Sequence, residues 1–231
     1  MLKLIKLEMK KVKMWGYIRG ALIANLVIIA LVALVIFGTT NEGNLRFTNF
    51  SVVFSLTDSL VKATFLIFSS VLIARFIIEE YKTNTITVLF MYPINRKKLM
   101  IAKLIIVVLF TFIAMVLSNI FIDFVLCMVN NFYNFIPGKL TATLVINTFM
   151  TICVNAFAAA GMGLIPLFFG MRKKSVPTTI ISAIIIVSIV CGNNGGVSLC
   201  SYIAIPISLA VVGVGIAYLS IRNIEHKDVG N

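Results

Sequence analysis

The sequence predicts an all-α polytopic membrane protein, and three observations lead to this fold class. Of the 231 residues, 60% are hydrophobic and only 12% are charged. One soluble core cannot bury so much apolar surface, so lipid must cover part of it. Apolar blocks long enough to cross a bilayer recur along the chain, and the cations gather on one side of them. We therefore expect a single transmembrane domain over residues 1–231, with six spanning helices.

The first expected element is an amphipathic helix over residues 1–19. Its basic stripe falls within an arc of about 80° on a helical wheel turning 100° per residue. The stripe consists of Lys3, Lys6, Lys10 and Lys13. The opposite face carries Leu, Met and Trp15, and such a helix lies flat among lipid headgroups. We expect Gly16 and Gly20 to let the chain turn into the first span. The helix serves either as an anchor that sets the topology or as an elbow linked to a moving partner.

Six apolar blocks follow, and a spanning helix needs about 20 mostly apolar residues. The predicted spans are residues 20–38, 57–78, 101–129, 140–169, 177–191 and 199–220. The fifth block is short: its apolar run reaches roughly 21 Å at 1.5 Å per residue, against a hydrocarbon core about 30 Å thick. Either the fifth helix borrows flanking residues, or residues 192–196 form irregular backbone in a polar cavity. Cys191 and Cys200 bracket this segment and could form a disulfide on an oxidising side.

The charge distribution orients the spans. With the N-terminus in the cytoplasm, every cation except Arg46, Lys62 and Lys139 falls on the inner side. This asymmetry is what the positive-inside bias predicts, and the opposite orientation would violate it. The net charge of +12 is therefore a topology signal, and we expect no nucleic-acid partner. Both termini are expected in the cytoplasm.

Polar residues recur in the fourth span at every fourth position. The row comprises Thr143, Asn147, Thr151, Asn155, Ala159 and Gly163. Small, hydroxyl and amide side chains of this kind let helices approach and form hydrogen bonds in lipid. The row therefore indicates either helix packing or a substrate path, for which the candidates are Asn147, Thr151 and Asn155. Pro166, near the inner end, predicts a kink.

The acidic residues argue against proton-driven transport. Such a transporter needs a titratable group near the middle of the bilayer. Asp58 and Asp123 come closest, but both lie toward the outer ends of their spans, and Lys62 stands one turn from Asp58 to neutralise it. The single histidine, His226, lies in the polar tail, so no metal site is expected. The phosphate-binding pattern G-x-x-x-x-G-K-[ST] is absent, so we expect this chain to bind no ATP and no other cofactor by itself.

Residues 79–99, which read EEYKTNTITVLFMYPINRKKL, separate the second span from the third. Residues 83–85 supply N-cap chemistry, Leu89 and Phe90 lie on one apolar face, and Pro93 ends the turn. We therefore expect a short helix over about 83–93. Arg96 and the two lysines after it begin the next helix, where the helix dipole disfavours cations, so lipid headgroups are the simplest reason for them. The segment is longer than a connection needs. It predicts either a docking site for a partner or packing against lipid.

The same segment resembles the one that comes after the second span in the membrane subunits of type-2 ABC exporters. The matching residues are Glu80–Tyr81–Lys82–Thr83–Asn84–Thr85, then Leu89, Phe90, Pro93–Ile94–Asn95–Arg96, and Lys103, with Asn84 in place of the family's usual glycine. The resemblance implies a coupling helix seated in a cleft of a separate ATP-hydrolysing subunit. Thr85 would lie at its start, Leu89 and Phe90 would be buried contacts, and Pro93 would set the exit angle. Glu79, Glu80 and Arg96 would pair with charges on the ATPase or on the first helix.

The resemblance also implies a function. The chain would be the permease of an ATP-driven exporter that moves an amphipathic peptide or peptide antibiotic out of a bacterial cell or its membrane. It would be no enzyme itself and hold no catalytic residue; two copies of the ABC ATPase would carry ATP and Mg. A second permease copy, identical or related, would complete the path within the lipid of the cell membrane. The alternatives are a non-transporting immunity or assembly protein that acts by binding, and a secondary transporter.

Overall fold

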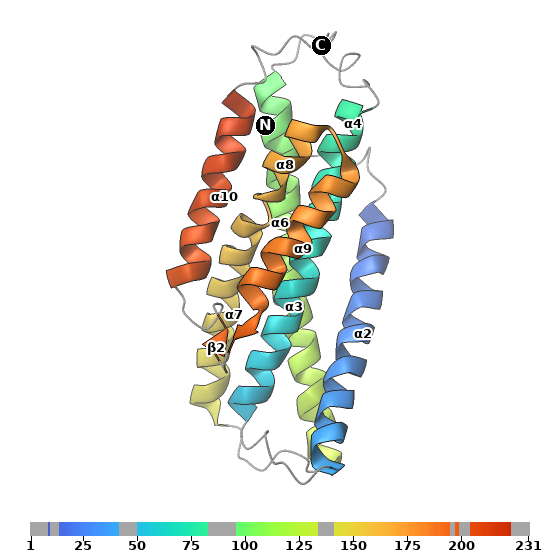
Figure 1. The fold of residues 1–231 in the computed structure, drawn as a ribbon. Helices are drawn as coiled ribbons and strands as arrows, with labels where there is room; N and C mark the ends of the chain where they lie inside the picture. Colours follow the sequence, from blue (N-terminus) through green and yellow to red (C-terminus); the bar gives the residue numbers. More distant parts are fainter. Residues whose placement is uncertain are drawn as a thin grey trace.

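The structure is a bundle of long helices (Figure 1). It is a computed structural model that describes residues 9, 14–41, 50–82, 96–133, 141–194, 197–198 and 204–222. The helices are α2 (Met14–Asn41), α3 (Phe50–Ile73), the π-helix η1 (Ala74–Ile78), α4 (Glu79–Lys82), α6 (Arg96–Tyr133), α7 (Ala142–Met162), α8 (Pro166–Lys173), α9 (Val176–Cys191) and α10 (Ala204–Arg222). Two strands of two residues each, β1 (Asn193–Asn194) and β2 (Val197–Ser198), are the other regular elements of the described part.

Five of the helical stretches are long and apolar enough to cross a membrane. They are Trp15–Ile36, Phe50–Lys82, Lys97–Phe132, Ala142–Lys173 and Ile205–Arg222. The sixth apolar helix, α9, is shorter at 16 residues. Each predicted span therefore contains a helix, and the predicted all-α polytopic fold is confirmed.

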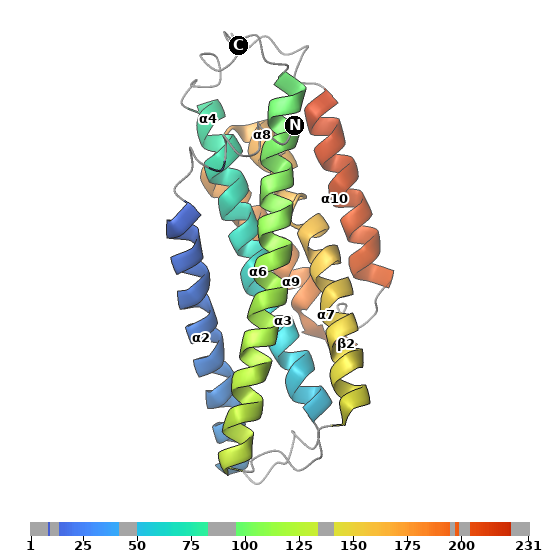
Figure 2. The same cartoon turned by 180° about the vertical axis from the view of Figure 1, so that it is seen from behind.

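The two ends of the bundle differ in charge. Figures 1 and 2 place α4, α8, the start of α6 and the end of α10 together at one end. We call it the basic end, because it carries Lys82, Lys98, Lys173 and Arg222. At the opposite end, the far end, α3 and α7 begin and α6 ends. An unequal distribution of cations of this kind is what the positive-inside bias uses to orient a membrane protein.

The first helix differs from the expectation. α2 begins at Met14 and runs without a break through Gly16 and Gly20, so the turn predicted at these glycines is wrong. Glycine permits a turn but does not force one. Here Tyr17 packs edge-on against Phe68 and Phe76, with ring centroids 6.2 and 5.6 Å apart, and this contact holds the first turns of α2 against the second span. The rest of the expected amphipathic helix, except Met9, lies outside the described residues.

The fourth span bends before Pro166, which confirms the predicted kink. α7 ends at Met162. The next backbone hydrogen bonds reach back three residues instead of four, from Leu164 N to Gly161 O (3.1 Å) and from Ile165 N to Met162 O (3.0 Å). Pro166 then occupies the first turn of α8, where its missing N–H costs no hydrogen bond.

The fifth helix stops early. After α9, β1 and β2 pair in antiparallel register, with Asn193 opposite Ser198 and Asn194 opposite Val197. Figures 1 and 2 both show this hairpin beside α7, short of the far end that α2, α3 and α6 reach. α9 thus gains no residues beyond Cys191. The irregular backbone predicted in a polar cavity stays a prediction, because residues 195 and 196 lie outside the described part of the chain.

Small residues bring α7 and α10 together near the basic end. A Cβ atom on Gly161 would lie 2.8 Å from Ala210 Cβ, and one on Gly213 would collide with the carbonyl oxygen of Gly161. The two backbones are thus in direct contact, as small residues allow in membranes. The close contact fixes the basic half of α7 within the bundle.

Candidate functional site

The predicted coupling helix falls between two described helices. Thr85, Leu89, Phe90 and Pro93 lie outside the described residues, as does the side chain of Arg96, whose backbone begins α6. Their contacts with an ATPase therefore stay a prediction. The structure describes the frame on both sides of the segment, which is formed by α4 and the first turns of α6.

A buried lysine ties this frame together. Lys103 of α6 is only 2% exposed. Its Nζ donates a hydrogen bond to Phe76 O at 3.0 Å and forms an ion pair with Glu80 of α4. The pair joins the end of the second span to the start of the third, directly at the base of the predicted coupling segment. The carboxylate of Glu80 is thus held by its own chain, and its predicted contact with a partner stays a prediction.

Glu79 has a more open setting. It pairs with Arg75 one turn earlier at 3.1 Å, and the two side chains are 43% and 59% exposed. Between them, η1 widens the helix, and Glu79 N–H bonds Ala74 O. π-helical turns of this kind insert a residue, rotate the helical residues after it, and occur frequently at functional sites. Here the rotation directs Glu80 to Lys103 while Glu79 stays at the surface.

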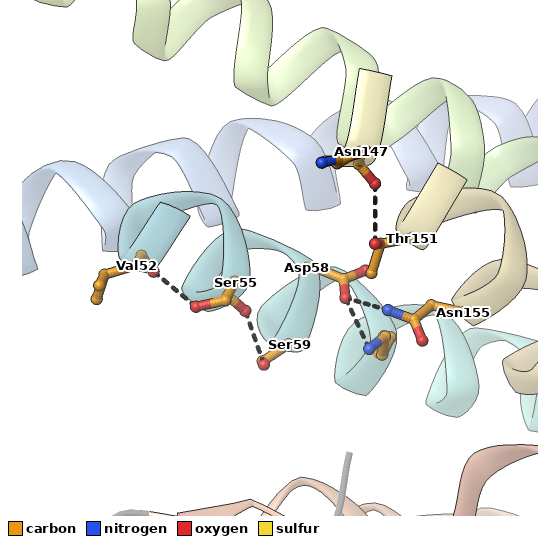
Figure 3. A network of polar contacts seen from close by, with 8 residues as sticks. Val52, Ser55, Asp58, Ser59, Asn147, Thr151 and Asn155 are labelled. Carbon is orange, nitrogen blue, oxygen red and sulfur yellow. Dashed lines mark hydrogen bonds and ion pairs between the residues drawn. The ribbon is translucent and has the colours of Figure 1, made fainter. Parts of the chain in front are cut away.

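A groove of ≈ 700 Å³ lies between α3 and α7, toward the far end. Most of the residues that line it have polar side chains, although both helices cross the apolar part of the protein. The hydroxyl, amide and charged residues of the lining are Ser51, Ser55, Asp58, Ser59 and Lys62 from α3, Thr141, which caps α7, and Thr143, Asn147, Thr148, Thr151 and Asn155 from α7. Figure 3 labels six of these residues, Ser55, Asp58 and Ser59 on α3 and Asn147, Thr151 and Asn155 on α7.

The floor of the groove is a buried ion pair. Asp58 Oδ2 accepts hydrogen bonds from Lys62 Nζ at 2.7 Å and from Asn155 Nδ2 at 2.8 Å (Figure 3). The three residues are 9%, 3% and 6% exposed, in the order Asp58, Lys62 and Asn155. The predicted pairing of Asp58 with Lys62 is confirmed. Asn155 adds a contact from α7, so the floor also joins the two helices.

The structure brings the three predicted substrate-path residues to one groove. Asn155 lies at its floor, and Asn147 and Thr151 lie on its exposed wall. Their role in transport stays a prediction. The opposite wall, with Ser55 and Ser59 of α3, was missed, although serines spaced by four in SVVFSLTDS were a signal for it.

The third helix around this floor is α6. Asn119 lies beside the Asp58 carboxylate, and Asp123 comes one turn later, close enough for the two carboxylates to repel each other. Neither amide atom of Asn119 meets hydrogen-bond geometry within the described part of the chain. In the same part, no three His, Cys, Asp or Glu side chains are placed to hold a metal ion.

Comparison with known proteins identifies similar chains. Residues 4–189 match a family described as "ABC-2 family transporter protein". The chain is also 43% identical, over 227 residues, to the uncharacterized protein YcbO of Bacillus subtilis, which covers 98% of this chain and 100% of that relative. No solved structure matches. The family match includes the groove and the segment between α4 and α6 alike.

Proposed function

The chain belongs to the ABC-2 family of transporter proteins, and from this premise we propose which cargo it moves and how it is driven. As a member, it is a membrane subunit of an ABC exporter and not itself the catalytic subunit. The cargo we propose is an amphipathic peptide or peptide antibiotic, expelled from the cell or from its membrane. A separate subunit supplies the energy by hydrolysing ATP with Mg.

The groove between α3 and α7 is the observation that supports transport of a partly polar molecule. Charged groups and side-chain amides exposed to lipid tails would be left without hydrogen bonds, which is costly in a bilayer. A polar groove at membrane depth therefore faces water, another protein or a cargo. An amphipathic peptide suits it because such a peptide presents polar groups to the groove and apolar groups to the exposed outer faces of the same helices.

The frame around residues 83–95 supports the proposed drive. Lys103 bonds the start of the third span to the end of the second, so the two move as a single mechanical unit. A force applied to the connecting segment therefore reaches both spans. In our proposal two ATPase copies grip this segment on two permease copies, identical or related. The basic end then faces the cytoplasm of a bacterial cell and holds both termini, in agreement with the positive-inside bias.

Affinity purification tests the partner. The tagged chain, extracted from its native membrane, is expected to retain an ATP-hydrolysing subunit. Phe90→Asp is expected to lose that subunit, because a charge on the apolar face would stay unpaired in the cleft. Phe132→Asp is the matched control, since Phe132 is exposed near the end of α6 at the far end. Equal recovery of the ATPase with both variants would refute residues 79–96 as the docking site.

Export and ATP-hydrolysis assays test the proposed energy source and the proposed cargo. Leu89→Lys is expected to stop export while leaving membrane insertion unchanged, whereas loss of insertion would indicate a structural role. ATP hydrolysis by the purified complex is expected to rise with amphipathic or cyclic peptides. If none of a broad panel stimulates it, the peptide assignment fails and the membership in the family remains.

A further inference from the structure

Three hydroxyl groups of the groove donate their protons to backbone carbonyls. Ser55 Oγ donates to Val52 O at 2.9 Å, Ser59 Oγ donates to Ser55 O at 2.8 Å, and Thr151 Oγ1 donates to Asn147 O at 2.9 Å (Figure 3). A hydroxyl has one proton and two lone pairs. Each of these three groups can therefore offer a ligand only an acceptor.

The carboxylate at the floor is also an unsatisfied acceptor. Both hydrogen bonds to Asp58 go to Oδ2, and Oδ1 has no partner within the described residues although it is buried. One N–H of the Asn155 amide donates to the same carboxylate. A buried carboxylate oxygen without a donor is expensive, and an ionisable group at membrane depth is by default a functional group.

We propose that this groove binds a cationic group of the cargo, a primary ammonium or a guanidinium. Asp58 Oδ1 is the ionic acceptor, and the hydroxyl oxygens of Ser55, Ser59 and Thr151 are the neutral acceptors around it. The inference rests on the proposed function, in that it names the recognition chemistry of the peptide that the protein exports.

The charges of the groove favour a cation over an anion. Among the described residues of the lining, Lys62 is the only cation, and it is nearly fully buried against Asp58, so an anion would have to break this pair. A ligand cation instead approaches Oδ1 while Lys62 and Asn155 keep Oδ2.

The size of the groove favours a ligand over a second copy of the chain. Its ≈ 700 Å³ lies within the range of about 300–1,000 Å³ typical of ligand pockets. This volume accommodates a lysine or arginine side chain with adjacent backbone. A whole helix of another copy would need a longer surface.

Peptide binding to the full-length chain in lipid nanodiscs tests the inference. The probes are a fluorescent amphipathic peptide with one lysine and the same peptide with that lysine acetylated, which removes the charge. Wild-type protein is expected to bind the lysine peptide about tenfold tighter, the scale of one charge-assisted hydrogen bond. The double variant Asp58→Asn with Lys62→Met is expected to lose this preference.

The double variant is chosen because a single Asp58→Asn change would leave Lys62 buried without a counterion and endanger folding. Thr57→Val is the matched control. Thr57 adjoins Asp58 on α3, but its hydroxyl bonds Val53 O and does not line the groove. This variant is expected to keep the tenfold preference.

Three outcomes of the binding experiment would overturn the inference, and a cross-linking result would be a fourth. These are equal binding of the two peptides to wild-type protein, an unchanged preference in the double variant, and no binding of either peptide. A fourth is direct cross-linking between copies through cysteines placed at Ser55 and Thr151 in a cysteine-free chain, since the groove would then be an interface. None of these outcomes depends on recovery of the ATPase. Failure to recover the ATPase would instead refute the proposal that ATP hydrolysis by a partner subunit drives transport.

Discussion

The basic end and the groove each contain a lysine–carboxylate pair, and the two pairs connect different things. Lys103 and Glu80 are 23 residues apart and join α6 to α4, and Lys103 also bonds a backbone carbonyl. Asp58 and Lys62 are one turn apart on α3. The first pair therefore closes a contact between spans. The second also joins α3 to α7 through Asn155, but it leaves Asp58 Oδ1 without a donor among the described residues. The comparison teaches that a lysine–carboxylate pair at a groove can keep an acceptor for a ligand.

The two halves of α7 show the same contrast in packing. Its basic half, residues 156–162, is almost entirely buried and touches α10 through Gly161. Its far half, residues 142–151, is mostly exposed. α10 begins only partway along the bundle, so it lies beside the first half and not beside the second (Figure 1). The groove runs along this exposed half, from Thr141 to Asn155.

The largest expected effect comes from breaking the cross-helix pair. Lys103→Met would leave Glu80 partly buried without its cation, and loss of one partner of a buried pair costs about 3–5 kcal/mol in the free energy of unfolding. This loss of stability is measured by thermal denaturation of the purified protein in detergent, with disappearance of the monodisperse peak as the readout. Lys103→Met with Glu80→Gln is expected to recover most of the loss. If Lys103→Met alone is as stable as wild type, the pair does not stabilise the contact between the two spans.

A smaller effect is expected where α7 meets α10. Gly213→Ala would drive a Cβ into the carbonyl oxygen of Gly161, and overpacking of this kind costs about 1–3 kcal/mol. Gly215→Ala is the control, because a Cβ there meets nothing within 4 Å. The same denaturation assay compares the two variants. Equal stability would mean that the helices can separate without cost.

The exposed pair near the basic end is expected to contribute less. Arg75→Gln removes the partner of Glu79 at the surface, where an ion pair contributes about 0.2–1 kcal/mol to stability. The difference from wild type is expected to shrink further at high salt, because salt screens exposed charges. A loss as large as that of Lys103→Met would place Arg75 in a structural role that its exposure does not explain.

The smallest effect on stability is expected in the groove wall. Thr151 is exposed, so Thr151→Val should change the free energy of unfolding by no more than about 0.5 kcal/mol. Its affinity for the lysine peptide should nevertheless fall by about threefold, the scale of one weak neutral hydrogen bond. Denaturation and peptide binding on the same preparation separate the two effects. Loss of stability without loss of binding would make Thr151 a packing residue.

Several features were predictable because they are local. The Asp58–Lys62 pair arises from helical spacing of four, and the kink arises from the missing N–H of Pro166. The turn at Gly16 and Gly20 was predicted wrongly, because aromatic contacts with a distant helix keep α2 straight there.

The contacts that create the candidate sites were not predictable in the same way. Lys103 with Glu80, and Asn155 with Asp58, join residues 23 and 97 positions apart. No periodicity within one helix encodes which face of another helix it will meet. For the same reason the sequence predicted Asn147, Thr151 and Asn155 as candidates for a substrate path but did not predict the opposite wall of the groove on α3.

The sequence by itself determined that this protein is helical, crosses a membrane several times and carries its positive charge at one end. These properties depend on residue composition and on spacing within single segments, and lipid imposes them segment by segment. Only the tertiary structure decided where α9 turns back, which half of α7 is covered, and which carboxylate oxygen stays without a donor. Those properties depend on how helices pack against one another, and packing brings together side chains that the chain itself keeps far apart.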